Sequence, residues 1–256
     1  MTTRDVCSPP RLLLTRRAAR PELVGAYVPP VPPPPLQVTP ADRDEFLELV
    51  LGVDEAGPPA HVQRLRARGV DVSALYLELF APTAERLGEM WSEDACDFLD
   101  VTLAMGRLQR AVRELGHDFV TGGPAGAEGG RVLLSAIPGE QHTLGLFMVA
   151  EYLLRDGWGV RVATPATSAE LASVLREHWV DVVGFSAACD TRLLALRHEI
   201  AAVRRHSRNP HVSIVVGGRI FVQHPELVGH VGADGFAASA ADAPCCARAL
   251  VGSHPG

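Results

Sequence analysis

The 256-residue sequence lacks the patterns that mark secreted, membrane-spanning and zinc-binding proteins. Its five cysteines form no Cys-x-x-Cys pair, and the only close pair, Cys245 and Cys246, is adjacent in sequence. This usage fits a reducing compartment rather than a disulfide framework or a zinc site. No apolar run approaches the length that spans a bilayer, and the N-terminus lacks the long apolar core of a signal peptide. We therefore expect a cytoplasmic protein with no membrane partner.

Positive charge is also in short supply. The chain has 24 Lys and Arg against 30 Asp and Glu, a formal net charge of −6, which argues against non-specific nucleic-acid binding by the whole chain. Two common enzyme motifs are missing as well. No Gly-x-Ser-x-Gly surrounds a candidate nucleophile, and no Gly-x-Gly-x-x-Gly follows the first predicted strand. A serine-hydrolase triad and a dinucleotide site are therefore disfavoured.

Composition divides the chain into four segments. Residues 1–38 are an irregular Arg- and Pro-rich tail, interpreted either as disordered or as a basic, apolar segment that docks on a partner or on the protein's own surface. Residues 39–120 carry four helical patterns with short connections, which predict a bundle. Residues 121–130 are a Gly-rich, flexible linker by composition. Residues 131–256 form the last segment.

The predicted helices of the bundle have readable boundaries. Thr39-Pro40 opens the first with a capping hydroxyl and a proline at the first helical position. The second is expected at 59–68, the third from 71 to about 91, and the fourth from about 96 onward. Pro82 lies inside the third pattern, so we expect it to bend that helix or to mark its restart.

From residue 131 onward, apolar strand patterns alternate with helical ones. Strands are predicted at 131–137, 158–163, 181–186, 212–217 and 233–237. Helices are predicted at 143–156, 168–178, 190–206, 220–229 and 241–251. Strict alternation predicts a parallel sheet with helices on both faces. The predicted fold class is therefore α/β, a flavodoxin-like doubly wound sheet of five parallel strands, preceded by an all-α four-helix bundle.

The loop after the first predicted strand holds one carboxylate and one imidazole, in the order Gly139-Glu140-Gln141-His142-Thr143-Leu144-Gly145. A strand, a short loop and a helix is the layout of a cofactor site at the carboxyl end of a strand. Glu140 can accept a proton from one nitrogen of His142 and leave the other nitrogen free for a metal. Gly145 lets a bulky ligand approach the backbone. A lone loop of this kind is more often a solvated turn, so the hypothesis depends on other strand ends.

Two later strand ends supply further observations. One apolar run ends at Ser186, and another ends at Gly217-Gly218. Together with the loop, they resemble the cobalamin-binding signature Asp-x-His-x-x-Gly, Ser-x-Leu and Gly-Gly, over roughly residues 131–251. Two positions differ from that signature. Glu140 replaces the Asp and lengthens the arm behind the imidazole, and Ala188 replaces the Leu and opens space near the buried nucleotide tail.

The resemblance implies a role for each residue. His142 would be the lower axial ligand of cobalt, in place of the cofactor's own base. Ser186, Gly217 and Gly218 would line the nucleotide tail, where no side chain fits past the strand end. Gly235 would help to close the slot. The alternatives are a Ser186 hydroxyl that satisfies its own backbone and a tight strand-to-helix turn at the glycine pair.

Trp91, at the end of the third predicted helix, is the second focus. A Trp there would ordinarily belong to the bundle core. In cobalamin proteins with a four-helix cap, the bundle covers the upper face of the corrin, and light sensors resembling CarH have a Trp followed after nine residues by Glu-His. Val101 and Thr102 stand at those positions here and cannot act as an upper ligand or a polar clamp. The resemblance therefore leaves Trp91, with apolar or small side chains of the helix 96–115, to bound the upper face.

The motifs of the bundle narrow the resemblance. They resemble the AerR/PpaA-type antirepressors more than any methyltransferase carrier. The motifs are Trp91-Ser92-Glu93-Asp94-Ala95-Cys96-Asp97-Phe98, Val101-Thr102-Leu103 and Gly106-Arg107-Leu108-Gln109, followed by Glu140-Gln141-His142. This implies a non-enzymatic photoreceptor that binds adenosyl-, methyl- or hydroxocobalamin and regulates transcription by contact with a repressor protein. No helix-turn-helix module precedes the bundle, so direct sequence-specific DNA binding is not expected.

Two other functional classes stay open. One is a corrinoid carrier subunit of a methyltransferase. The other is a haem- or bilin-binding sensor on the same scaffold. An absorption spectrum before and after illumination separates the three.

Overall fold

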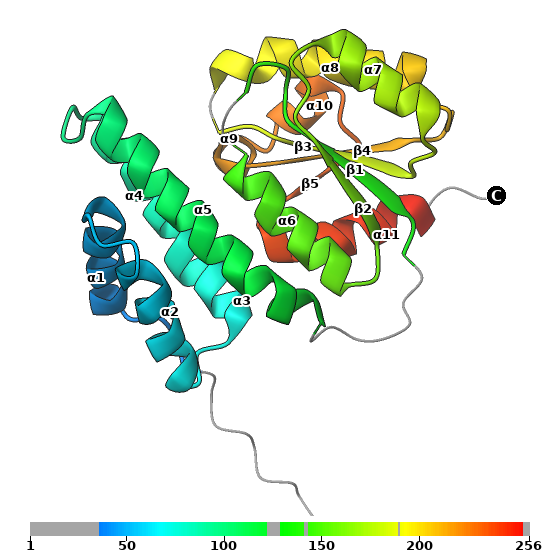
Figure 1. The fold of residues 1–256 in the computed structure, drawn as a ribbon. Helices are drawn as coiled ribbons and strands as arrows, with labels where there is room; N and C mark the ends of the chain where they lie inside the picture. The colour runs from blue at the N-terminus through cyan, green and yellow to red at the C-terminus, as the bar shows by residue number, and fades with distance from the viewer. Residues whose placement is uncertain (1–35, 122–128, 141–142, 189, 253–256) are drawn as a thin grey trace, which may run out of the picture. The chain divides into compact units, whose positions relative to one another are not determined.

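A computed structural model describes residues 36–121, 129–140, 143–188 and 190–252. These residues all belong to one compact unit, Pro35–Gly256, which holds a helical part followed by a five-stranded sheet (Figure 1). Most of the Arg- and Pro-rich tail lies outside the described residues, so both interpretations of it stay predictions. In the described part of the chain, no helix combines the length and the apolar character needed to cross a bilayer.

The helical part has the elements that the sequence patterns predicted. They are α1 (Pro40–Leu51), α2 (Gly57–Ala67), α3 (Val72–Ala74), a π-helical segment η1 (Leu75–Phe80), α4 (Ala81–Ser92) and α5 (Phe98–Thr121). Thr39 caps α1, as expected. Its hydroxyl accepts the Asp42 N–H, and the Asp42 carboxylate accepts the Thr39 N–H at 2.9 Å, which makes a capping box.

The third predicted helix is irregular next to Pro82. Leu75–Phe80 is π-helical, and the Ala81 N–H donates to the Tyr76 carbonyl, five residues back. α4 then begins at Ala81, with Pro82 in its first turn. Proline has no N–H, and its ring crowds the carbonyl four residues back, so a widened turn before it relieves both problems. The expected restart at Pro82 is therefore present as a π-helical turn followed by a new α-helix.

The sheet confirms the predicted fold class. Its strands are β1 (Arg131–Ser135), β2 (Gly159–Ala163), β3 (Val182–Ser186), β4 (Ser213–Gly217) and β5 (Gly235–Ala237). All neighbours pair in parallel, in the order β2-β1-β3-β4-β5. This is the doubly wound flavodoxin-like order, in which ligands bind beyond the carboxyl ends of the strands.

Helices cover both faces of this sheet (Figure 1). They are α6 (Leu144–Arg155), α7 (Ser168–Glu177), α8 (Leu193–His206), α9 (Arg219–Gln223), α10 (Leu227–Val231) and α11 (Ala243–Gly252), with 3-10 turns η2 (Asp190–Arg192) and η3 (Ala240–Asp242). The helix predicted at 220–229 is divided in two, because Pro225 cannot donate a helical hydrogen bond. Val132 and Leu134 pack toward α6 and α11, whereas Leu133 packs toward α7 and α8.

α6 belongs to two hydrophobic cores. Leu144, Met148 and Tyr152 lie in one cluster with the buried residues of α1 to α5. Leu146, Ala150 and Leu153 lie in another, against β1 and α11. Hydrogen bonds reinforce the first contact. The Tyr76 hydroxyl donates to Glu151 Oε2 at 3.1 Å, and the Tyr152 hydroxyl lies 2.6 Å from Ser73 Oγ. The helix that follows the predicted cofactor loop is thereby built into the helical part.

Candidate functional site

The loop after β1 begins with a tight turn. The Glu140 N–H donates to the Ile137 carbonyl at 2.8 Å, and Gly139 has a φ of 77°. Proline at the second position of a turn and a positive-φ glycine at the third are the residues of a type II turn, and Pro138-Gly139 supplies them. Gln141 and His142 lie outside the described residues, so the cobalt-ligand role of His142 stays a prediction.

Arg192, from the 3-10 turn η2 that follows the neighbouring strand β3, contacts the start of this loop. Its Nε lies 3.6 Å from Glu140 Oε2, and its Nη2 donates to the Gly139 carbonyl at 3.4 Å. The Glu140 side chain is only 11% exposed, so its carboxylate is largely shielded from solvent and lies next to the Arg192 guanidinium. Arg192 belongs to η2, which follows β3, and β3 pairs with β1. Sequence reasoning missed Arg192, because its role depends on strand order and on no local motif.

Three predicted site residues come together at the carboxyl edge of the sheet. A Cβ on Gly145, in the first turn of α6, would lie 3.5 Å from Ser186 Oγ. Ser186 is paired in register with Gly217 at the ends of β3 and β4. Every second residue of β3 and β4 faces α6 and α11, and Ser186 and Gly217 are among these residues. Two glycines and one small hydroxyl, Gly145, Ser186 and Gly217, therefore lie together where α6 meets the sheet, and these three residues are called the cradle.

Gly217 and Gly218 differ in what surrounds them. A Cβ on Gly217 would lie 3.4 Å from the Ala237 carbonyl oxygen, an ordinary contact. Gly218 has a φ of 106° and a ψ of 165°, a region that is essentially open to glycine alone, and a Cβ there would overlap the Ala187 carbonyl. Gly218 is thus needed for the strand-to-helix turn itself, whereas neither the backbone conformation nor the neighbouring atoms require glycine at Gly217.

Gly235 is explained by helix packing. A Cβ there would lie 3.2 Å from Leu250 Cδ1 and 3.3 Å from Cys246 Sγ, both on α11. Gly235 pairs with Val215, two residues before Gly217, so it lies farther back from the carboxyl edge. Its bare backbone lets α11 approach β5. The structure does not bring Gly235 together with Ser186.

Trp91 is half exposed, at 52%, and does not belong to the bundle core. It shares the end of the bundle with three other exposed apolar side chains, and the four together are called the apolar tip. They are Trp91, Phe98, Leu99 and Leu103. The Thr102 hydroxyl donates to the Phe98 carbonyl at 2.7 Å, and its lack of a clamping role stays a prediction.

One ion pair ties the end of α4 to the glycine turn. Arg219 Nη1 lies 3.4 Å from Glu89 Oε1, across 130 positions of sequence. Arg219 is the first residue of α9 and directly follows Gly218, and Glu89 lies two residues before Trp91. The helix that ends in the apolar tip is therefore attached to the same sheet edge as the cradle.

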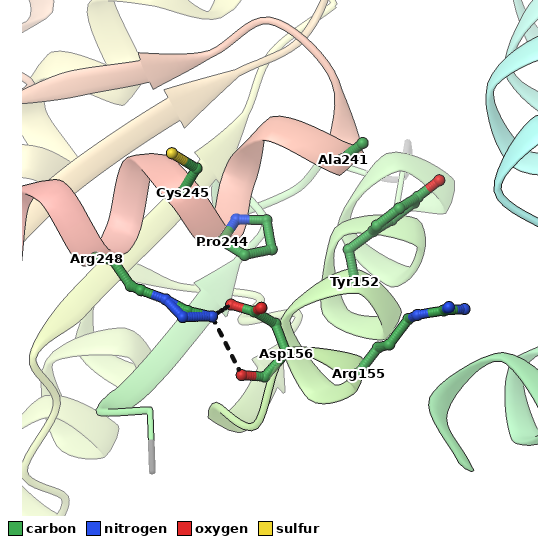
Figure 2. A pocket seen from close by; sticks show the side chains of 7 residues that line it. All are labelled: Tyr152, Arg155, Asp156, Ala241, Pro244, Cys245 and Arg248. Carbon is green, nitrogen blue, oxygen red and sulfur yellow. Dashed lines mark hydrogen bonds and ion pairs between the residues drawn. The ribbon is translucent and has the colours of Figure 1, made fainter. Parts of the chain in front are cut away.

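A separate hollow of about 390 Å³ lies at the other end of α6, between α6 and α11 (Figure 2). Its cationic side chains are already engaged. Arg248 is paired with Asp156, and Arg155 lies 4.4 Å from the centre of the Phe119 ring. None of the predicted site residues that the structure describes lines this hollow.

Comparison with known proteins finds a family similarity over the sheet and the helices around it. Residues 130–245 match the family model described as the B12 binding domain. A relative from Rhodobacter capsulatus, described as an uncharacterized 20.5 kDa protein in the bchF-crtJ intergenic region, is 29% identical over 170 residues, which are 66% of this chain and 88% of the relative. The structure of the Methanosarcina barkeri monomethylamine corrinoid protein matches with a TM-score of 0.66 at 17% identity, over 80% of this chain and 96% of that one. This likeness extends to the helical part and shows the fold.

Proposed function

We propose, from the B12 binding domain at residues 130–245, that this protein is a cobalamin-binding light sensor that regulates transcription through contact with a repressor. The observation that carries the cofactor is the cradle. Gly145, Ser186 and Gly217 come from three elements and meet at the carboxyl edge, as the cobalamin signature requires. The pair of Glu140 and Arg192 lies beside it, in the described part of the loop and two positions before His142 in the sequence.

The residues present fit the cofactor in two places. The cradle residues place no large side chain where α6 meets the sheet, which suits the passage of a nucleotide tail there. The apolar tip suits the flat, largely apolar upper face of a corrin, because an indole packs well against such a surface. His142 would bind cobalt from the loop, and Glu140 would orient the imidazole. An alkylated cobalamin supplies a light-sensitive cobalt–carbon bond.

α6 offers a route from the cofactor to the surface of the protein. It begins directly after the His142 loop, and its Leu144, Met148 and Tyr152 pack into the bundle core. A change above a bound corrin would alter what the apolar tip contacts, and the bundle would then repack against the sheet domain. These two packings are the two states whose populations light would shift. The repressor would bind one of them.

Spectroscopy tests cofactor binding and the metal ligand. The apo protein is loaded with hydroxo-, methyl- and adenosylcobalamin in the dark, and spectra are recorded before and after illumination. We expect a spectrum in which the cofactor's base has left cobalt and a histidine has replaced it, and His142→Ala should abolish it. His224→Ala, at an exposed histidine paired with Glu226, is the control. An unchanged spectrum in His142→Ala would refute the ligand assignment.

Trp91→Ala tests the upper face. We expect this variant to bind cobalamin through the tail, to lose the preference among the three upper ligands, and to lose the light-induced change in elution volume on size exclusion. Trp179→Ala, at an exposed Trp near the amino edge of the sheet, is the matched control. If Trp91→Ala keeps both the ligand preference and the light response, the apolar tip has no sensing role.

A corrinoid carrier is the second candidate, supported by the likeness to the monomethylamine corrinoid protein. A carrier would exchange a methyl group with a methyltransferase, and illumination would not alter its affinity for a protein partner. A haem-binding sensor would show a Soret band after reconstitution with haem. The same spectra, with methyl transfer measured in the dark, separate these outcomes from a light-driven switch.

A further inference from the structure

A second candidate binding site lies at the amino edge of the sheet, opposite to the cradle. A hollow of about 540 Å³ opens there, beside the edge strand β2. Its lining comes from the starts of β1 and β2, the connection from α7 to β3, and one residue between α8 and β4. The main polar and aromatic residues are Arg131, Arg161, Glu177, His178, Trp179 and Arg208. We call it the arginine hollow.

Strand register brings two of its arginines together. Arg131 pairs with Gly159, and Leu133 pairs with Arg161, so all four residues lie on one face of the sheet. Leu133 is fully buried against α7 and α8, which identifies that face. The residue opposite Arg131 on β2 is Gly159, which has no side chain, and Arg161 follows Gly159 by two residues on the same strand. Both guanidinium groups can therefore reach the same hollow.

Trp179 forms a fixed aromatic wall. It is 43% exposed, and its indole N–H donates to Asp181 Oδ1 at 3.0 Å. The other oxygen of Asp181 accepts the Arg131 N–H at 2.7 Å, so the carboxylate is held by the start of β1. Arg208, between α8 and β4, donates to the Glu177 carbonyl at 3.3 Å. A ring and a cation thus face solvent in set positions.

The charge of the hollow opposes that of the chain. The chain carries −6, yet the hollow gathers three arginines and His178, with Glu177 as its own acid and Asp181 beside it. Within the described part of the chain, the guanidinium groups of Arg131 and Arg161 have no ion pair with a carboxylate. All 24 basic residues of the sequence are arginines, whose planar, forked guanidinium matches phosphate oxygens two at a time.

We propose that the arginine hollow binds a nucleotide. The base stacks on Trp179, and the phosphates are bound by Arg131, Arg161 and Arg208. The volume of the hollow falls in the range of small-ligand sites. Because any base can stack on a Trp, we expect affinity to depend on the number of phosphates and on the presence of a base, and not on which base it is. This site is independent of the cobalamin cradle, because it uses the opposite ends of the strands.

Calorimetric titration of the full chain tests the proposal, with ATP, adenosine and tripolyphosphate as probes. ATP should bind saturably and quench tryptophan emission, and adenosine and tripolyphosphate should each bind about tenfold more weakly or worse, since each lacks one half of the contacts. Equal binding of tripolyphosphate and ATP would show a simple anion patch. Tighter binding of a single-stranded oligonucleotide than of ATP, or no saturation at millimolar ATP, would also overturn the proposal.

Variants locate the site. Trp179→Leu and Arg161→Gln should each weaken ATP binding about tenfold or more, and Trp179→Phe should recover most of the loss because it keeps a ring. Arg110→Gln, an exposed arginine of α5 paired with Glu55, is the matched control. Each variant is checked by thermal unfolding and by cobalamin uptake, which should match those of the wild type. If both hollow variants fold and bind ATP like the wild type, the arginine hollow is not a nucleotide site.

Discussion

Gly217 and Gly218 are neighbours in the chain, yet they lack side chains for different reasons. Gly218 adopts a backbone conformation that excludes other residues, and the Ala187 carbonyl occupies the place of its Cβ. Gly217 has ordinary backbone geometry and belongs to the cradle. The sequence motif treats both as tail-lining residues. The structure shows that a side chain at Gly218 would disturb the fold before it met any ligand, so the two positions have separable roles.

Substitutions at the two glycines should separate stability from binding. Gly218→Ala should lower the free energy of unfolding of the apo protein by about 1–3 kcal/mol, because of backbone strain. Gly217→Val should change it by about 1 kcal/mol or less and weaken cobalamin binding about tenfold or more, because its side chain enters the cradle. Urea unfolding and cobalamin titration measure the two effects. A Gly217→Val protein with wild-type affinity would exclude this slot.

Arg192 should act on cobalamin through the loop that it contacts. Arg192→Gln removes the ion pair with Glu140 and should lower cobalamin affinity by at most about tenfold, the lower end of the effect of losing a direct partner of a metal ligand, because Arg192 would act only through Glu140. Stability should change by about 1 kcal/mol at most, because Arg192 is 40% exposed. Arg204→Gln, on α8 and paired with Asp234, is the control for a lost surface ion pair. Equal losses in both variants would contradict a specific role.

At the scale of elements, hydrophobic periodicity predicted the helices and strands, but it could not predict the contacts between them. The strand patterns gave each strand to within two residues, because burial on both faces leaves continuous apolar runs between polar loops. Thr39-Pro40 placed the start of α1, because the cap is a local interaction. Arg192 could not be found in this way, since its partner Glu140 lies 52 positions away and meets it only through strand pairing.

Asp42 makes the start of α1 sensitive to acid. Burial alone would raise the pKa of Asp42, but hydrogen bonds from Arg68 and Thr39 outweigh it and lower the pKa to about 2. A depressed folded-state pKa stabilises the protein above the unfolded value of about 4, and that stabilisation is lost as pH falls toward 2. Asp42→Asn should cost about 2 kcal/mol at pH 7 and flatten the unfolding curve across this window.

The control for that curve is Asp44→Asn, at an exposed position of the same helix. It changes the charge of α1 equally but leaves the capping box and the Arg68 contact in place. Guanidinium unfolding is measured for all three proteins between pH 2 and 7. If the free energy of unfolding of Asp42→Asn falls with decreasing pH as steeply as that of the wild type, Asp42 does not govern the acid sensitivity.

At the scale of the whole molecule, one carboxyl group lies between the bundle and α6. Burial raises the pKa of Glu151, and the hydrogen bond from Tyr76 offsets part of that rise. Burial, followed by the charge of Glu151, raises the pKa of Tyr76. A Cβ on Gly116 of α5 would overlap the Glu151 carboxylate, so α5 approaches α6 closely here. The contact between the two parts therefore favours a protonated Glu151.

This predicts a pH dependence opposite in sign to that of Asp42. A folded-state pKa above the unfolded value means that the folded protein binds the proton more tightly, so stability falls as pH rises from the ordinary glutamate pKa toward the raised one. Glu151→Gln stays neutral, and its stability should not decline over that interval. Urea unfolding from pH 4 to 8 measures this, with Glu85→Gln, at an exposed position of α4, as the control. A decline that persists in Glu151→Gln would rule out this contact as its origin.

Because α6 contributes to the core of the bundle and to that of the sheet, the two parts cannot melt one at a time. Losing the sheet removes Leu144, Met148 and Tyr152 from the bundle, and losing the bundle uncovers the same three side chains. Heating should therefore give one calorimetric peak, with equal calorimetric and van't Hoff enthalpies, despite a glycine-rich joint. A chain that ends at Thr121 would lack the three α6 side chains that cover the bundle core, and its melting temperature should be well below that of the intact protein. Cooperativity here is carried by one shared helix.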